Sequence, residues 1–153
     1  MDELVRWFGE QLDEDERIAR VAATLAVPTL GAMNWRSVEG PSDAGGTYWC
    51  ITTTPPNDTA PVVELVGSGM SGGGVHEEAV ARHIAAHDPA RVLREIDAKR
   101  AVLALHTQSI RDDGCQVCDV PGGRRLRPDA CTTVRLLAVV YADRPGYRET
   151  WRP

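Results

Sequence analysis

The sequence lacks a long hydrophobic run: no stretch approaches the about eighteen uninterrupted apolar residues that a membrane-spanning helix requires. It also lacks the basic and then apolar N-terminus of a secretory signal, because the chain opens with the acidic Asp2 and Glu3. These absences argue against a membrane protein and predict a cytoplasmic location. With 153 residues, 42% hydrophobic and 25% charged, the composition predicts one globular domain that buries roughly 70% of its unfolded surface.

Charge is distributed unevenly along the chain. Residues 1–80 hold 4 basic and 13 acidic side chains, a balance of −9, whereas residues 81–153 hold 13 basic and 9 acidic ones, a balance of +4. A protein with a net negative charge repels a phosphate backbone at long range. A positively charged half of the chain can still bind a nucleic acid or an acidic protein locally. The charge pattern therefore leaves both kinds of partner open.

The first half predicts a helix followed by strands. Residues 2 to about 24 have apolar side chains on a helical period, with the acidic run Asp13-Glu14-Asp15-Glu16 on the other positions. The apolar positions are Leu4, Trp7, Phe8, Leu12, Ile18 and Ala22. Short runs rich in β-branched and aromatic residues follow at 33–38, 47–53 and 61–66, separated by glycine and proline turns. These runs predict a small antiparallel β-meander.

The second half predicts helices. A glycine-rich linker at 68–74 precedes a short helix over about 76–87, and Asp88 and Pro89 supply an N-cap and a first position for a helix to about His106. The two helices should form a hairpin. A last short helix, capped by Thr132 or Thr133, runs through Tyr141. The fold class is therefore α+β in a single domain, 1–153, made of residues 1–67, the linker and a helical half at 75–153.

Four residues in the helical half have the spacing of a metal site. His106 is followed after eight residues by the C-x-x-C turn Cys115 to Cys118, and Cys131 follows twelve residues later. Thiolates and imidazole are the ligands that Zn²⁺ prefers, and four of them close a tetrahedron. The intervening loop has few apolar residues with which to build a core. The pattern therefore predicts a structural zinc ion, with no catalytic role.

Two other interpretations of the cysteines stay open. A redox pair would need the C-x-x-C to follow a strand and open a helix, as in thioredoxin-type proteins, whereas this turn follows a helix. Alternatively, the cysteines are reduced and bind no metal. This interpretation stays open because His106 is assigned as the fourth ligand from its position in the sequence alone. Cys50, in a strand, is expected to be an apolar core residue.

Three further motifs are weaker. Residues 67–72 match G-x-G-x-x-G and residues 69–73 match G-x-S-x-G, but a dinucleotide fold needs a parallel strand after the next helix and a hydrolase elbow belongs to a larger sheet. We therefore expect a flexible linker and no nucleotide cofactor. His83 and His87 are four residues apart on a helix, but Ile84 stands where a zinc protease has its glutamate.

Several segments of the sequence are similar to a known family. They are Met1 to Val5, Leu12 to Ala19, Ala81 to Ile96, Ala98 to Arg100, Leu136 to Ala138, Tyr141 to Asp143, Pro145 to Glu149 and Trp151 to Pro153. With them the chain resembles a family of small proteins of unknown function from actinobacteria and their phages. The layout more distantly resembles Ea22-type phage early-region proteins. The resemblance implies a similar histidine and cysteine arrangement and no catalytic residues.

Three functions follow from these observations. The leading hypothesis is a non-enzymatic accessory or interaction protein with a structural zinc site, because no nucleophile with its base, carboxylate pair or open metal site can be assembled. The alternative is a zinc-dependent regulator that binds nucleic acid through Arg124, Arg125 and Arg127. The second alternative is a metal- or thiol-dependent enzyme that uses His83, His87 and Asp88.

Overall fold

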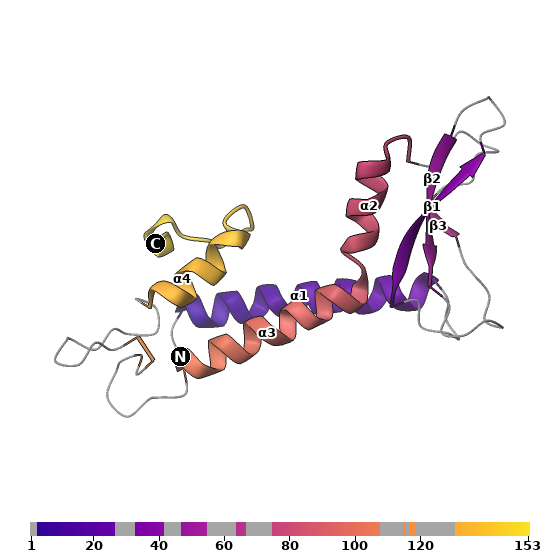
Figure 1. Cartoon of the computed structure of the whole chain (residues 1–153). Coiled ribbons are helices and arrows are strands. Elements are labelled where there is room, and N and C mark those ends of the chain that lie inside the picture. Colours follow the sequence, from indigo (N-terminus) through magenta and orange to yellow (C-terminus); the bar gives the residue numbers. More distant parts are fainter. Residues whose placement is uncertain are drawn as a thin grey trace. The chain divides into compact units, whose positions relative to one another are not determined.

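The computed structural model describes residues 3–26, 33–41, 47–54, 64–66, 75–107, 115, 117–118 and 131–153. Its elements, shown in Figure 1, are α1 (Glu3–Ala26), β1 (Trp35–Pro41), β2 (Thr47–Thr53), β3 (Glu64–Val66), α2 (Glu78–Ala86), α3 (Pro89–Thr107), α4 (Thr132–Ala138) and the 3-10 turns η3 (Val139–Tyr141) and η4 (Glu149–Trp151). The expected α+β class is confirmed. None of the helices in the described ranges is long and apolar enough to cross a membrane.

The chain divides into two compact units. The first unit joins Met1–Asp15 to Glu95–Pro153, and the second unit is Glu16–Arg94. Helices α1 and α3 therefore each contribute residues to both units. The glycine-rich linker predicted at 68–74 lies outside the described residues.

The second unit contains the sheet. Its strand order is β1-β2-β3, with antiparallel pairing of β1 to β2 from Trp35 opposite Thr53 to Pro41 opposite Thr47. This order is the predicted meander. Helix α2 packs against the sheet through Ala81 and Ala85, which are buried with Ile51 (Figure 1). The small alanine side chains let the helix approach the pleated surface closely.

Asp88 fixes the start of α3 as the sequence predicts. Its Oδ1 accepts a hydrogen bond from the backbone N–H of Arg91 at 2.7 Å, which is the N-cap interaction. Its Oδ2 accepts a second bond from the backbone N–H of Trp35 at 3.3 Å. One carboxylate therefore both begins a helix and holds the first strand, so it is already engaged inside the second unit.

The buried stripe of α1 follows a helical period along the whole helix. Leu4, Phe8 and Leu12 are completely buried. The same stripe continues through positions 15, 19 and 23, where Ala19 and Ala23 are buried, whereas Ile18 is 51% exposed. The prediction that placed Ile18 on the apolar face is wrong because the 3.6-residue period selects its neighbour Ala19.

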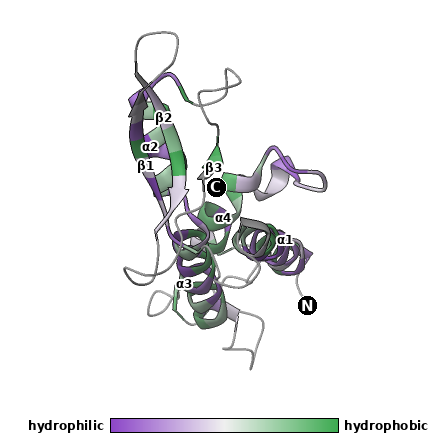
Figure 2. Ribbon diagram, turned by 90° about the vertical axis from the view of Figure 1, so that its right-hand side faces the viewer, coloured by the Kyte–Doolittle hydropathy of each residue, from purple (hydrophilic) through white to green (hydrophobic). Residues whose placement is uncertain are grey.

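The C-terminal segment packs on the first turns of α1. The ring of Trp7 lies 5.5 Å from that of Tyr147 and 5.4 Å from that of Trp151, and its indole N–H donates to the Pro145 carbonyl at 3.0 Å. Figure 2 shows the hydrophobic residues of α1 and α4 in green. The N-cap position of α4 is Cys131 and not a threonine, because the Cys131 carbonyl already accepts the Arg135 N–H. This corrects the predicted cap at Thr132 or Thr133.

Candidate metal centre

Three segments of the first unit carry the four predicted metal ligands. His106 lies in the last turn of α3, Cys115 and Cys118 lie in the turn that follows, and Cys131 immediately precedes α4. The helix end and the helix start are both fixed by backbone hydrogen bonds, so they present their side chains in defined directions. The site therefore connects two helices through a C-x-x-C turn.

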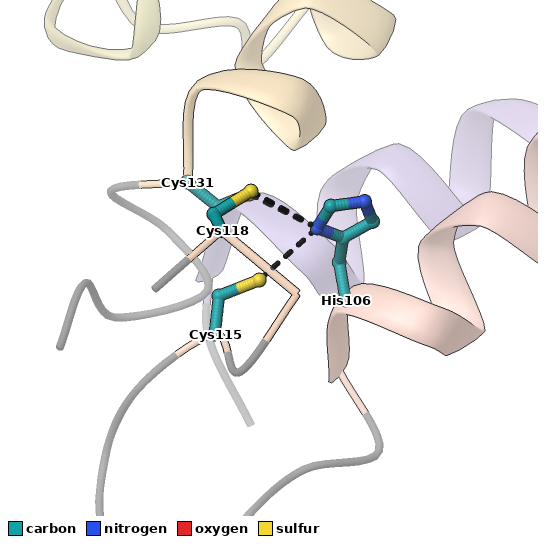
Figure 3. A group of neighbouring side chains, drawn as sticks. All are labelled: His106, Cys115, Cys118 and Cys131. Atoms are coloured by element: carbon teal, nitrogen blue, oxygen red, sulfur yellow. Dashed lines mark hydrogen bonds between the residues drawn. The ribbon is translucent and has the colours of Figure 1, made fainter. Parts of the chain in front are cut away.

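The structure brings the four side chains together, as Figure 3 shows. The Nδ1 atom of His106 lies 3.0 Å from the Cys115 sulfur, 3.3 Å from the Cys131 sulfur and 3.5 Å from the Cys118 sulfur. All four ligand atoms lie within 4.8 Å of one another. One imidazole nitrogen has a single proton or a single lone pair and cannot satisfy three thiols by hydrogen bonding. Three sulfurs and one imidazole nitrogen gathered in this way are typical of ligands around a common metal ion.

The ligand atoms are close enough to bind one metal ion and too far apart for a disulfide. With zinc–sulfur bonds of about 2.3 Å and zinc–nitrogen bonds of about 2.0 Å, neighbouring ligand atoms of a tetrahedron stand roughly 3.5–3.8 Å apart. The Cys118 and Cys131 sulfurs are separated by 3.3 Å, far beyond the about 2.05 Å of a disulfide, and the cysteines are free thiols. The donor atoms therefore sit close to the positions that a bound ion would require.

Burial closes the site on most sides. Cys115 and Cys131 are completely buried and His106 is 6% exposed, whereas Cys118 is half-buried and contacts the Thr133 hydroxyl at 3.6 Å. A set of four protein ligands leaves no coordination position for a substrate. The arrangement can hold an ion and link its three segments, and it offers no open position for catalysis.

Cys50 is not a member of this group of ligands, as the sequence predicts. It belongs to β2 in the second unit and is 7% exposed. Arg124, Arg125 and Arg127, the predicted partner contacts, lie outside the described residues.

The alternative metal site around His83 and His87 gains no third ligand. Within the described ranges, His106 and the three cysteines form the only group of three or more potential ligands. The centroids of the His83 and His87 rings lie 4.2 Å apart with the ring planes tilted by 44°, and His87 Nδ1 donates to the His83 carbonyl at 2.7 Å. Asp88 is occupied at the start of α3. His87 and Asp88 therefore make local hydrogen bonds, and no third ligand joins the histidine pair in the described residues.

A polar network around Tyr141 was not anticipated from the sequence. The hydroxyl of Tyr141 donates to Asp15 at 2.9 Å and accepts from Lys99 at 3.0 Å. Arg144 binds the other Asp15 oxygen at 2.5 Å and lies over the tyrosine ring. Burial first, and then the hydrogen bond and charge of Asp15, raise the pKa of Tyr141 well above its ordinary value.

Three ion pairs of the first unit connect the acidic and basic halves of the sequence. Arg100 binds Asp13 and Arg144 binds Asp15, each at 2.5 Å, and Arg148 binds Glu3. In each pair the acid comes from α1 and the arginine from the second half of the chain. Part of the negative charge of the first half of the sequence is therefore paired with arginines of the second half within this unit.

The fold and the site define a small α+β protein with a buried cluster of one histidine and three cysteines. Residues 1–153 match the family of unknown function DUF6221, so the chain belongs to this family. No match was found among curated proteins or among solved structures. The expected membership of a family of unknown function is confirmed, whereas the likeness to Ea22-type proteins stays a prediction.

Proposed function

We propose that this chain is a non-enzymatic accessory protein of the cytoplasm that binds another protein, and that one structural zinc ion holds its first unit together. The observation that carries the proposal is the convergence of three thiols and one imidazole on a common point. The free thiols support a reducing compartment, where cysteines are kept available for metal. A role in actinobacterial cells or their phages, which the resemblance implies, is part of the proposal.

Zinc is the ion that this donor set favours. Thiolate and imidazole ligands in a closed set of four are typical of structural zinc sites, whereas calcium and magnesium require oxygen ligands. The ion would supply folding energy, because it ties the end of α3 and the start of α4 to a stretch of sequence that has few apolar residues. Its contribution is therefore to the order of the first unit, without a chemical step.

A protein partner fits the charges better than a nucleic acid does. Binding to a phosphate backbone requires lysines or arginines that are available to neutralise it. In the described part of the first unit, Arg100, Arg144 and Arg148 are paired with acids of α1. The alternative regulator assigns its nucleic-acid contacts to Arg124, Arg125 and Arg127, which lie outside the described residues.

The metal is tested by elemental analysis of protein purified under reducing conditions. We expect one zinc per chain in the wild type and none in His106→Ala or Cys115→Ser. Cys50→Ala is the matched control, because it removes a buried thiol of the other unit, and it should keep the zinc. A wild-type protein without metal, or loss of the metal in Cys50→Ala, would contradict the assigned site.

The partner class is tested by an electrophoretic shift assay with mixed DNA and RNA at low salt. The proposal expects no shift. A salt-sensitive shift that weakens when Arg124 and Arg125 are both changed to alanine would instead favour the nucleic-acid regulator.

A further inference from the structure

The four ligands of the cluster differ in their protection from solvent. Cys115 and Cys131 are completely buried, whereas Cys118 is half-buried and its neighbour Val117 is 57% exposed. A small oxidant dissolved in water therefore reaches the Cys118 sulfur first. Reactivity of cysteines follows accessibility together with thiolate character, and binding to a metal keeps a sulfur in the thiolate form.

The exposed sulfur has a partner at short range. The Cys118 and Cys131 sulfurs lie 3.3 Å apart, so they need to approach by only about 1.2 Å to reach disulfide distance. All three sulfurs contact His106 Nδ1, at 3.0 Å from Cys115, 3.3 Å from Cys131 and 3.5 Å from Cys118, so the short sulfur–sulfur contact is what singles out one pair. The geometry thus favours one of the three possible cysteine pairs, and it is not the pair of the C-x-x-C turn.

We propose that the cluster is a peroxide-sensitive switch in which oxidation joins Cys118 to Cys131 and releases the metal ion. The inference rests on the proposed zinc site. In the first step the Cys118 thiolate attacks hydrogen peroxide, the O–O bond breaks, and the products are a sulfenic acid and hydroxide. In the second step the Cys131 thiolate attacks the Cys118 sulfur, the S–S bond forms and a second hydroxide leaves.

These two steps balance and remove half of the ligand set. Two thiolates lose two electrons and one peroxide gains them. The ion then keeps only Cys115 and His106, and a structural zinc site needs four ligands. Because Cys131 immediately precedes α4 and His106 ends α3, release of the ion removes the link between these two helix ends. Binding of a partner to this part of the first unit would respond to oxidation.

The test treats the zinc-loaded full chain with hydrogen peroxide. A colorimetric chelator measures the zinc released, a thiol reagent counts free cysteines, and mass spectrometry of unreduced peptides identifies the disulfide. We expect release of one zinc per chain, loss of two of the four thiols, a Cys118–Cys131 disulfide, and reversal by a thiol reductant with added zinc. A disulfide between Cys115 and Cys118, oxidation without a disulfide, or retention of zinc would overturn the proposal.

Two variants sharpen the result. Cys118→His replaces the exposed sulfur by another zinc ligand and should keep its zinc under the same peroxide treatment. Cys50→Ala should release zinc as the wild type does. If Cys118→His fails to bind zinc, the proposal is judged by which disulfide is mapped in the wild-type protein. Wild-type protein that never binds zinc would contradict the proposed function, whereas zinc-bound protein that resists peroxide contradicts only the switch.

Discussion

Tyr141 illustrates how a single hydroxyl can order several segments. It is 5% exposed and its hydroxyl group donates to Asp15 and accepts from Lys99. Replacement by phenylalanine in Tyr141→Phe leaves the packing in place and removes both bonds. Hydrogen bonds to charged groups contribute about 1.5–3 kcal/mol, so we expect the free energy of unfolding to fall by about 1–3 kcal/mol in urea titrations.

Tyr147 provides the control for this measurement. In the described part of the chain its buried hydroxyl has no hydrogen-bond partner. An unpaired buried hydroxyl costs free energy, so Tyr147→Phe should be neutral or stabilising. If both phenylalanine variants lost the same stability, the Tyr141 hydrogen bonds would not be the cause.

The raised pKa of Tyr141 also predicts a dependence of stability on pH. In the unfolded chain its phenol ionises near the ordinary pKa of about 10, whereas burial and Asp15 keep it neutral in the folded protein to higher pH. The stabilisation is therefore complete below about pH 10 and decreases above it, by up to about 1.4 kcal/mol per pH unit. Urea titrations at several alkaline pH values should show this slope in the wild type and a shallower one in Tyr141→Phe.

Asp15 shows why sequence reasoning misses such a residue. An acidic run is usually a solvated helix face, and the sequence pattern predicts this role for all four acidic residues at 13–16. The helical period places Asp15 in line with the buried Leu12 and Ala19, and its side chain is 21% exposed. Its partners Tyr141 and Arg144 are more than a hundred residues away in the sequence, so only the tertiary fold could identify them.

At the level of elements, the C-terminal segment packs tightly against α1 at Gly146. Its φ is +87°, and a β-carbon placed there would lie 2.9 Å from the indole nitrogen of Trp7. Gly146→Ala therefore combines a left-handed backbone with a clash, and we expect a loss of roughly 1–3 kcal/mol in urea unfolding. Unchanged stability would mean that the segment does not pack on Trp7 as described.

Gly9 lies on the same helix α1 and offers the opposite expectation. A β-carbon there would meet nothing within 4 Å. Gly9→Ala should therefore raise the free energy of unfolding by roughly 0.5–1 kcal/mol, because alanine loses less backbone entropy in a helix. The measurement is the same urea titration, and a loss of stability at Gly9 would show that the helix is closely packed at this position.

The elements and the ligand set were predictable to different degrees. The cap at Asp88, the strand runs and the spacing of the four metal ligands are local signals. In the described residues the structure confirms the cap, an antiparallel three-stranded sheet and the proximity of the four ligand side chains. The cap of α4 and the burial of Ile18 are predicted wrongly, because they depend on backbone hydrogen bonding and on the exact phase of the helix. The differing exposure of the cysteines also required the folded chain.

At the scale of the whole molecule, the metal site belongs to one of two units. All four ligands lie within Glu95–Pro153, whereas the sheet and α2 of the second unit have their own core around Ile51, Ala81 and Ala85. The two units share helices α1 and α3 but not the site. Loss of the ion should therefore act locally before it acts globally.

Hydrogen exchange with and without a strong zinc chelator tests this distinction. Removal of the ion should increase amide exchange in α4 and in the last turn of α3, because those backbone segments lose the link that orders them. Amides of β1, β2 and α2 should keep their protection, since their hydrogen bonds and buried contacts lie within the second unit. The same chelator added to Cys115→Ser should change nothing. If protection collapsed equally in both units of the wild type, the chain would unfold as a single cooperative domain and the ion would stabilise all of it.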